Sequence, residues 1–121
     1  MRQAVVSNSA LSRGTFALVV LVSLAVLFSP QSDVPPALPG VDKAVHLVLF
    51  AALAGTGRWA GIGRRALTAP LVGYAAVSEV IQGIAPLDRS ASVGDWLADV
   101  VGVLLGLALW AWFARPHRPV A

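Results

Sequence analysis

The chain has 121 residues, of which 57% are hydrophobic and only 12% are charged, and its mean hydropathy is +0.76. Soluble domains carry about 25% charged residues, so this composition argues against a soluble protein and against disorder, and it indicates a multi-pass membrane protein. The lack of cysteine excludes disulfides, thiolate metal sites and cysteine nucleophiles, while the net charge of +3 comes from scattered basic residues that form no stripe for nucleic acid.

Four apolar segments are each long enough to cross about 30 Å of hydrocarbon as a helix. The predicted spans are about residues 15–30, 41–59, 66–86 and 93–114. Lipid-exposed backbone has to satisfy its own hydrogen bonds, so we expect an all-α bundle of four transmembrane helices. This membrane domain, 15–114, is then flanked by a cytoplasmic N-terminal segment, 1–14, and a cytoplasmic tail, 115–121.

The first apolar segment also has the features of a cleaved signal peptide, because basic residues precede a compact apolar core. No small-x-small cleavage site follows Phe28, however, and Pro30 and Gln31 come instead. We therefore expect a retained helix.

The basic residues predict the orientation of the chain. Seven of the nine lie before the first span, between the second and third, or after the fourth. These seven are Arg2, Arg13, Arg58, Arg64, Arg65, Arg115 and Arg118. An even number of helices puts all three groups on one side of the membrane, and short basic segments favour the cytoplasmic side. Both termini are therefore expected to be cytoplasmic, with the acidic residues on or near the opposite side.

Polar residues on three of the predicted spans come to a similar depth below the outer surface. They are Asp42, Lys43 and His46 at the start of the second span, Glu79 and Gln82 near the end of the third, Arg89 in the next loop, and Asp95 and Asp99 at the start of the fourth. Charges within a span are costly and usually face a bundle interior or a wet cavity. This pattern favours an outward-facing polar pocket; the alternatives are a network that only fixes helix packing and, for Asp42 and Asp95, simple helix caps.

Small residues recur every four positions along the fourth span, at Gly94, Ala98, Gly102 and Gly106. Such a ridge lets another helix approach closely. We expect it to pack inside the bundle and to turn Asp99 inward; self-association into a homo-oligomer through the same ridge is the alternative.

The ordered set of motifs resembles the VanZ-like family of small bacterial membrane proteins. The set is Asp42-Lys43-x-x-His46, Glu79-x-x-Gln82, Arg89 and Asp95-x-x-x-Asp99-x-x-Gly102, and it covers about residues 41–106. The resemblance implies a place in the bacterial cytoplasmic membrane and a role like that of the name-giving member, which is associated with reduced sensitivity to the glycopeptide teicoplanin. It also implies that the matching polar residues are functional. Where this chain has Asp99 the family usually has Asn, which adds an acid here.

Several functions stay open on this sequence. One is a protein that binds a cell-envelope lipid, a wall precursor or a lipophilic glycopeptide, because mixed acids and bases suit a sugar or an amine-bearing headgroup. Another is a membrane-embedded enzyme that uses the acids and His46 for acid–base or metal chemistry. The spacing matches no established metal motif, so neither a metal nor a cofactor is expected. A proton-coupled carrier and a purely structural subunit are the remaining alternatives.

Overall fold

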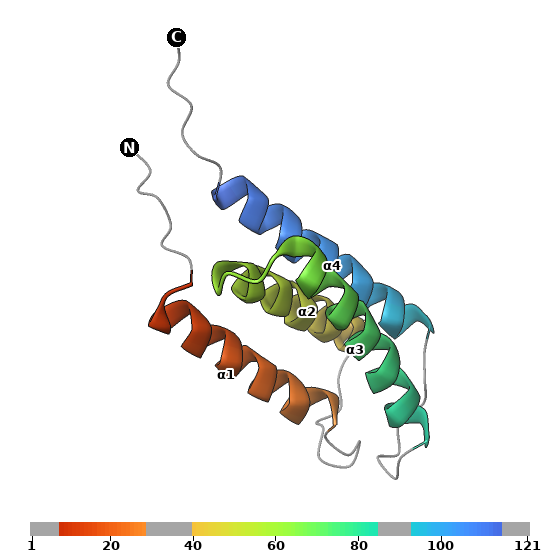
Figure 1. The fold of residues 1–121 in the computed structure, drawn as a ribbon. Coiled ribbons are helices and arrows are strands. Elements are labelled where there is room, and N and C mark those ends of the chain that lie inside the picture. Colours follow the sequence, from red (N-terminus) through yellow and green to blue (C-terminus); the bar gives the residue numbers. More distant parts are fainter. Residues whose placement is uncertain (1–7, 29–39, 85–92, 115–121) are drawn as a thin grey trace.

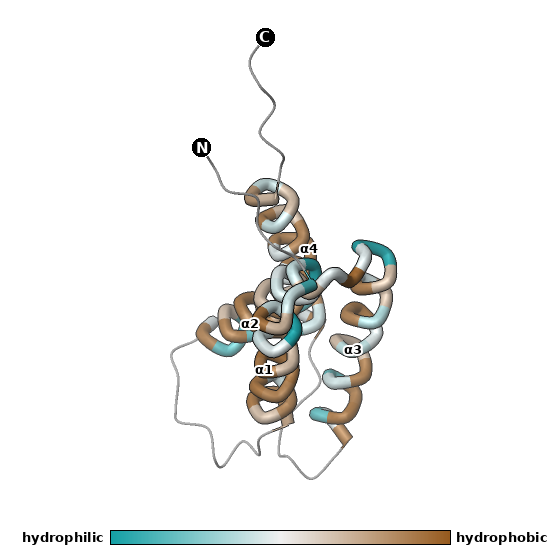
Figure 2. Tube along the Cα trace, turned by 60° about the vertical axis from the view of Figure 1, so that its left-hand side comes forward, coloured by the Kyte–Doolittle hydropathy of each residue, from teal (hydrophilic) through white to brown (hydrophobic). Residues whose placement is uncertain are grey.

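The computed structural model describes residues 8–28, 40–84 and 93–114, and within them the chain forms four α-helices that run alternately up and down (Figure 1). The helices are α1 (Ala10–Leu27), α2 (Val41–Trp59), α3 (Arg64–Ile84) and α4 (Val93–Phe113). The prediction of an all-α fold is therefore confirmed for the described residues. Figure 2 shows hydrophobic residues along the lengths of the helices and hydrophilic residues mainly toward their ends.

The first helix begins earlier than the predicted span, which started at residue 15. Ser9 and Ser12 form a reciprocal capping box, in which each side-chain oxygen accepts a hydrogen bond from the other residue's backbone N–H. Arg13 is exposed in the first turn and donates to the Asn8 side-chain oxygen over 3.1 Å. A charge in this first turn therefore does not prevent the helix from starting at Ala10.

Three of the described helices, α1, α3 and α4, are long and apolar enough to cross a membrane. The prediction of four spans is thus confirmed for three helices. The remaining helix, α2, carries three charged residues within its 19 residues, namely Asp42, Lys43 and Arg58. It contacts each of the other three helices.

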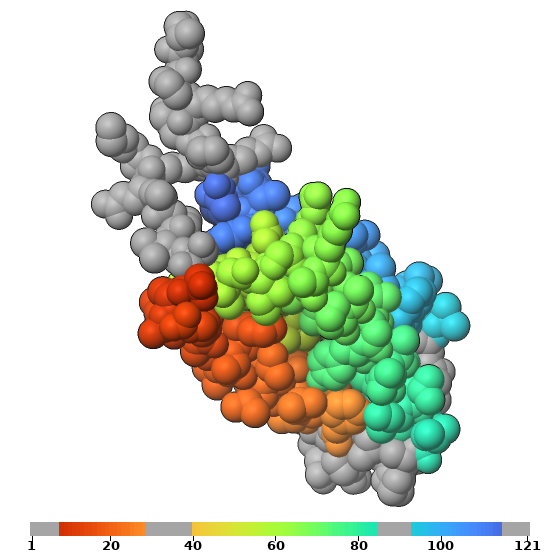
Figure 3. Space-filling view, viewed as in Figure 1, coloured from red at the N-terminus to blue at the C-terminus, as the bar shows by residue number. Residues whose placement is uncertain are grey.

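The hydrophobic core is built around α2. Its buried side chains pack against residues of all three neighbours; the cluster contains Leu27, Leu49, Phe50, Leu53, Ala54, Leu67, Leu71, Ala75 and Val103. In the space-filling view α1 and α3 form most of the near face (Figure 3). Large apolar side chains on every helix point outward and are exposed, which suits a molecule whose surrounding solvent is lipid.

The most extensive helix contact in the described chain is between α2 and α4. Gly102 and Gly106 of α4 are buried, and a Cβ atom on either would collide with a backbone carbonyl oxygen of α2, that of Leu47 or Ala51. The other two ridge positions, Gly94 and Ala98, are partly buried. The small-residue ridge therefore lies against α2 at its last two positions, Gly102 and Gly106, and the two backbones come into direct contact there.

Candidate functional site

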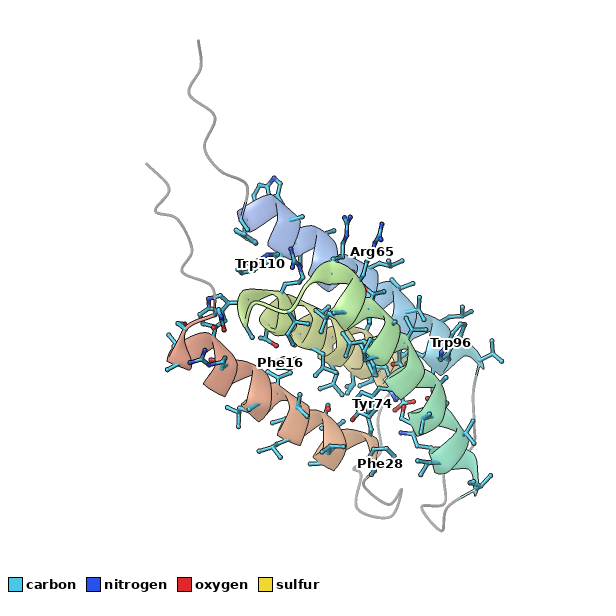
Figure 4. All side chains as sticks on the ribbon, in the orientation of Figure 1. Phe16, Phe28, Arg65, Tyr74, Trp96 and Trp110 are labelled. Atoms are coloured by element: carbon cyan, nitrogen blue, oxygen red, sulfur yellow. The ribbon has the colours of Figure 1, made fainter. Side chains whose placement is uncertain are left out.

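The polar residues singled out in the sequence come together at one end of the bundle. Their described members are Asp42, Lys43, His46, Glu79, Gln82, Asp95 and Asp99, whereas Arg89 lies outside the described residues. Because the helices alternate in direction, the starts of α2 and α4 meet the end of α3 (Figure 1). Figure 4 shows Arg65 and Trp110 at one end of the bundle and Phe28 and Trp96 at the other, which is the polar end.

The centre of this site is a buried pair between α2 and α4. His46 Nδ1 lies 2.7 Å from Asp99 Oδ1, and the two side chains are 2% and 0% exposed. With Asp99 ionised, its oxygen only accepts hydrogen bonds, and Nδ1 is then the donor. Gly102 lies one turn after Asp99, and its close contact with α2 allows the two short side chains to meet. The bond fixes the imidazole ring and leaves Nε2 on its other side.

Acidic groups lie on both sides of the imidazole. On the Nδ1 side, Glu79 Oε1 lies 3.9 Å away, and its side chain is buried. On the Nε2 side, Asp42 Oδ1 also lies 3.9 Å away, but its side chain is 61% exposed. His46 thus connects a buried layer, which contains Glu79 and Asp99, with the surface of the molecule.

The surface layer of the site consists of Asp42 with the ion pair of Lys43 and Asp95. Lys43 Nζ lies 3.2 Å from Asp95 Oδ1, and the two side chains are 55% and 10% exposed. Lys43 is the exposed partner of this pair, and Asp95 is largely buried. Asp42 and Lys43 therefore form an accessible mouth, with Asp95 beneath it.

Gln82 closes the site on the side of α1. Its buried Nε2 donates to the backbone carbonyl of Leu27, one of the last α1 carbonyls that lack a partner within their own helix. This contact gives Gln82 a packing role in addition to the predicted binding role.

Two residues of the polar network were missed in the sequence. Ser23 Oγ donates to the Val20 carbonyl over 2.7 Å, and it lies 2.9 Å from the Tyr74 hydroxyl, which therefore donates to it. The pair links α1 to α3, and Figure 4 shows Tyr74 between these two helices. A single serine and a single tyrosine in apolar runs give no recognisable pattern, so only the packing of the helices identifies them.

The site contains polar atoms without a hydrogen-bond partner among the described residues, namely Asp99 Oδ2 and Trp96 Nε1. Such buried atoms are uncommon and costly.

Two groups of three side chains in the described chain are of the types that ligate metals, and within each group one atom of every side chain lies within 4.8 Å of the others. The first group is Asp42, His46 and Asp95, and the second is His46, Glu79 and Asp99. The members of each group come from more than one helix, so no fixed spacing in the sequence marks them.

Comparison with known proteins gives a single finding. The family model described as VanZ/LLP1 matches residues 3–114. No curated protein and no solved structure matches the chain. The match extends beyond residues 41–106, which carried the resemblance in the sequence, and it includes the first helix.

Proposed function

Because the chain belongs to the VanZ/LLP1 family, we propose that it is an integral protein of the bacterial cytoplasmic membrane that binds the polar headgroup of a cell-envelope lipid, a lipid-linked wall precursor or a lipophilic glycopeptide. One observation carries this proposal: polar side chains from three helices converge at one end, below an accessible mouth. The apolar flanks beside that mouth keep a ligand's hydrocarbon chain in lipid while its headgroup meets the polar residues.

The mouth offers both kinds of hydrogen-bonding group. The Lys43 ammonium donates, and the carboxylates of Asp42 and Asp95 accept. A headgroup with hydroxyl or amino groups next to an acidic group matches this combination, as in an amino sugar attached to a phosphate or carboxylate. Such a headgroup occurs on wall precursors, and glycopeptides carry similar groups. A role of the teicoplanin-resistance type is one consequence of binding either ligand.

The proposed orientation places the polar end outside the cell. Four described arginines, Arg13, Arg58, Arg64 and Arg65, belong to the opposite end, where α1 and α3 begin and α2 ends. Basic residues flanking spans favour the cytoplasmic side. In this arrangement α2 also spans the membrane, between its three apolar neighbours, and both termini are cytoplasmic.

Cysteine labelling tests this orientation, because the chain has no cysteine of its own. In intact cells we expect a membrane-impermeant maleimide to label Asp42→Cys, whose parent side chain is exposed. Arg64→Cys should react only after the cells are permeabilised. The cysteine-free parent is the blank, and labelling of Arg64→Cys in intact cells contradicts the proposed orientation.

Ligand binding is tested by native mass spectrometry of the protein released from nanodiscs that contain total bacterial envelope lipid. We expect the parent to retain a headgroup-specific lipid. The double variant Asp42→Asn, Lys43→Gln should retain at least about tenfold less, since one charge-assisted hydrogen bond contributes about 1.5–3 kcal/mol. Teicoplanin added as a competitor separates a glycopeptide ligand from a lipid.

The matched control for this experiment is the double variant Arg64→Gln, Arg65→Gln, which changes two exposed charges at the other end of α3. It should retain as much of the lipid as the parent. Equal retention by the folded Asp42→Asn, Lys43→Gln variant would refute the headgroup site.

A second candidate function is an enzyme that acts on the same headgroup. The observation in its favour is the buried Asp99, which orients the His46 ring so that Nε2 is available as a general base. The same mass spectra decide between the two functions. A time-dependent change in the mass of the retained lipid, absent in His46→Gln, indicates catalysis, and a constant mass indicates binding alone.

A further inference from the structure

Three residues at and beneath the mouth of the polar end bring potential ligand atoms for one cation close together. Asp42 and Asp95 lie in the first turns of α2 and α4, and His46 lies one turn into α2. One ligand atom from each lies within 4.8 Å of the other two, and His46 Nε2 is 3.9 Å from Asp42 Oδ1. Ligands around a single Zn²⁺ ion lie about 3–3.5 Å apart, given bonds of about 2.0–2.2 Å. A small rotation of the exposed Asp42 side chain would close this difference for the His46–Asp42 pair.

A second, independent observation concerns the imidazole itself. His46 is almost wholly buried, and its only hydrogen bond among the described residues joins Nδ1 to Asp99. Nε2 therefore has no hydrogen-bond partner there, and it faces Asp42. A histidine that ligates a metal almost always donates its other N–H to a carboxylate, which fixes the ring and its tautomer. Asp99 supplies this carboxylate, so the ring is already held in the orientation that a metal ligand needs.

From these two observations we infer that Asp42, His46 and Asp95 bind a divalent transition-metal ion of the Zn²⁺ or Mn²⁺ class. One imidazole with two carboxylates suits such ions, whereas Mg²⁺ and Ca²⁺ prefer oxygen ligands alone. The ion enters from water, because Asp42 is exposed at the mouth. It takes the place that the Lys43 ammonium holds beside Asp95 in this structure, and Lys43, half-exposed, swings outward.

The other group of candidate ligands, His46, Glu79 and Asp99, is less suitable. It meets the ring on the Nδ1 side, where the hydrogen bond to Asp99 already occupies the nitrogen. An ion there has to displace this proton and enter a site with no exposed ligand. The structure therefore assigns the ion to the Nε2 side.

A bound ion has a consequence for the proposed ligand. Three protein ligands leave coordination positions open, as in catalytic metal sites, and a phosphate oxygen can occupy one of them. The ion thus offsets the repulsion between the carboxylates and a phosphate-bearing headgroup. This consequence rests on the proposed headgroup function, whereas metal binding itself does not, so the two are tested separately.

The experiment uses the full-length, untagged protein in detergent micelles, freed of metal by a chelator and without added lipid. Isothermal titration with ZnCl₂ should show one saturable site per chain, and MgCl₂ should show none. Asp42→Asn should lower the Zn²⁺ affinity at least about tenfold, because it removes a charged ligand. Glu79→Gln, which changes a neighbouring acid on the opposite side of the ring, should leave the affinity within about threefold. Lys43→Gln should raise it, because the competing ammonium is gone.

Electron paramagnetic resonance of bound Mn²⁺ provides a direct readout of the ligand atoms. We expect hyperfine coupling to a nitrogen nucleus, present in the parent and in Glu79→Gln and absent in His46→Gln. Should His46→Gln fail to fold by circular dichroism, the exposed Asp42→Asn carries the test alone. The inference is overturned if folded parent protein shows no saturable Zn²⁺ binding up to millimolar concentration. It is equally overturned if Glu79→Gln loses the ion while Asp42→Asn keeps it.

Discussion

Replacing His46 by leucine is expected to lower the free energy of unfolding by about 3–5 kcal/mol, the cost of removing one partner from a buried pair. His46 is the only hydrogen-bond partner of Asp99 among the described residues, and the Asp99 side chain is fully buried. Leucine fills much of the same space but donates no hydrogen bond, so both carboxylate oxygens are left without a donor. Equilibrium unfolding in mixed micelles measures the change.

The double variant His46→Leu, Asp99→Leu serves as the test of the cause. It removes both polar partners, and an apolar pair in an apolar interior leaves no group unsatisfied. We therefore expect it to be more stable than His46→Leu alone. Val45→Leu, a change at an exposed neighbouring position, should alter stability by no more than about 0.5 kcal/mol. If the double variant is less stable than the single one, the loss does not come from the stranded carboxylate.

Adding a methyl group to the ridge of α4 is expected to have the next largest effect. Gly102→Ala and Gly106→Ala should each lower the free energy of unfolding by about 1–3 kcal/mol, as overpacking does in close-packed interiors. Each new Cβ would meet a backbone carbonyl oxygen of α2, that of Leu47 or Ala51, which cannot move as a flexible side chain can. The helices then separate, and the distance between His46 and Asp99 increases. The same unfolding measurement detects the change.

Gly73→Ala is the matched control, because Gly73 lies on the exposed side of α3 and a Cβ atom there meets nothing within 4 Å. Alanine is favoured over glycine within a helix by about 1 kcal/mol, so this variant should be at least as stable as the parent. A Gly102→Ala variant that is as stable as Gly73→Ala would contradict the direct contact between α2 and α4.

The polar end contains the packing network that the sequence left open as an alternative, with an accessible layer above it. The buried layer is a network that fixes helix packing, since the His46–Asp99 bond joins α2 to α4 and Gln82 joins α3 to α1. The mouth has no such role, because Asp42 and Lys43 are more than half exposed and contribute little to packing. In the proposed binding site, the contacts of this buried layer hold the ligand-binding groups in place.

The amino-acid sequence by itself determined the helical architecture. Long apolar runs in a chain with few charges have one stable solution in lipid, which is a set of helices that satisfy their own backbone. The family followed from the order and spacing of the polar motifs. The sequence also placed the polar residues near the ends of the spans. Because successive helices run in opposite directions, those ends come to the same side of the bundle.

Only the tertiary structure decided which polar atoms meet. The central position of α2, the sharing of His46 between Asp99 on one nitrogen and Asp42 on the other, and the bond from Gln82 to α1 all depend on how far each helix is rotated and shifted against its neighbours. Hydropathy encodes the apolar face of a helix but not that rotation, which is set by the close contact of Gly102 and Gly106 with the α2 backbone. A metal site built from two helices has no fixed spacing in the sequence for the same reason.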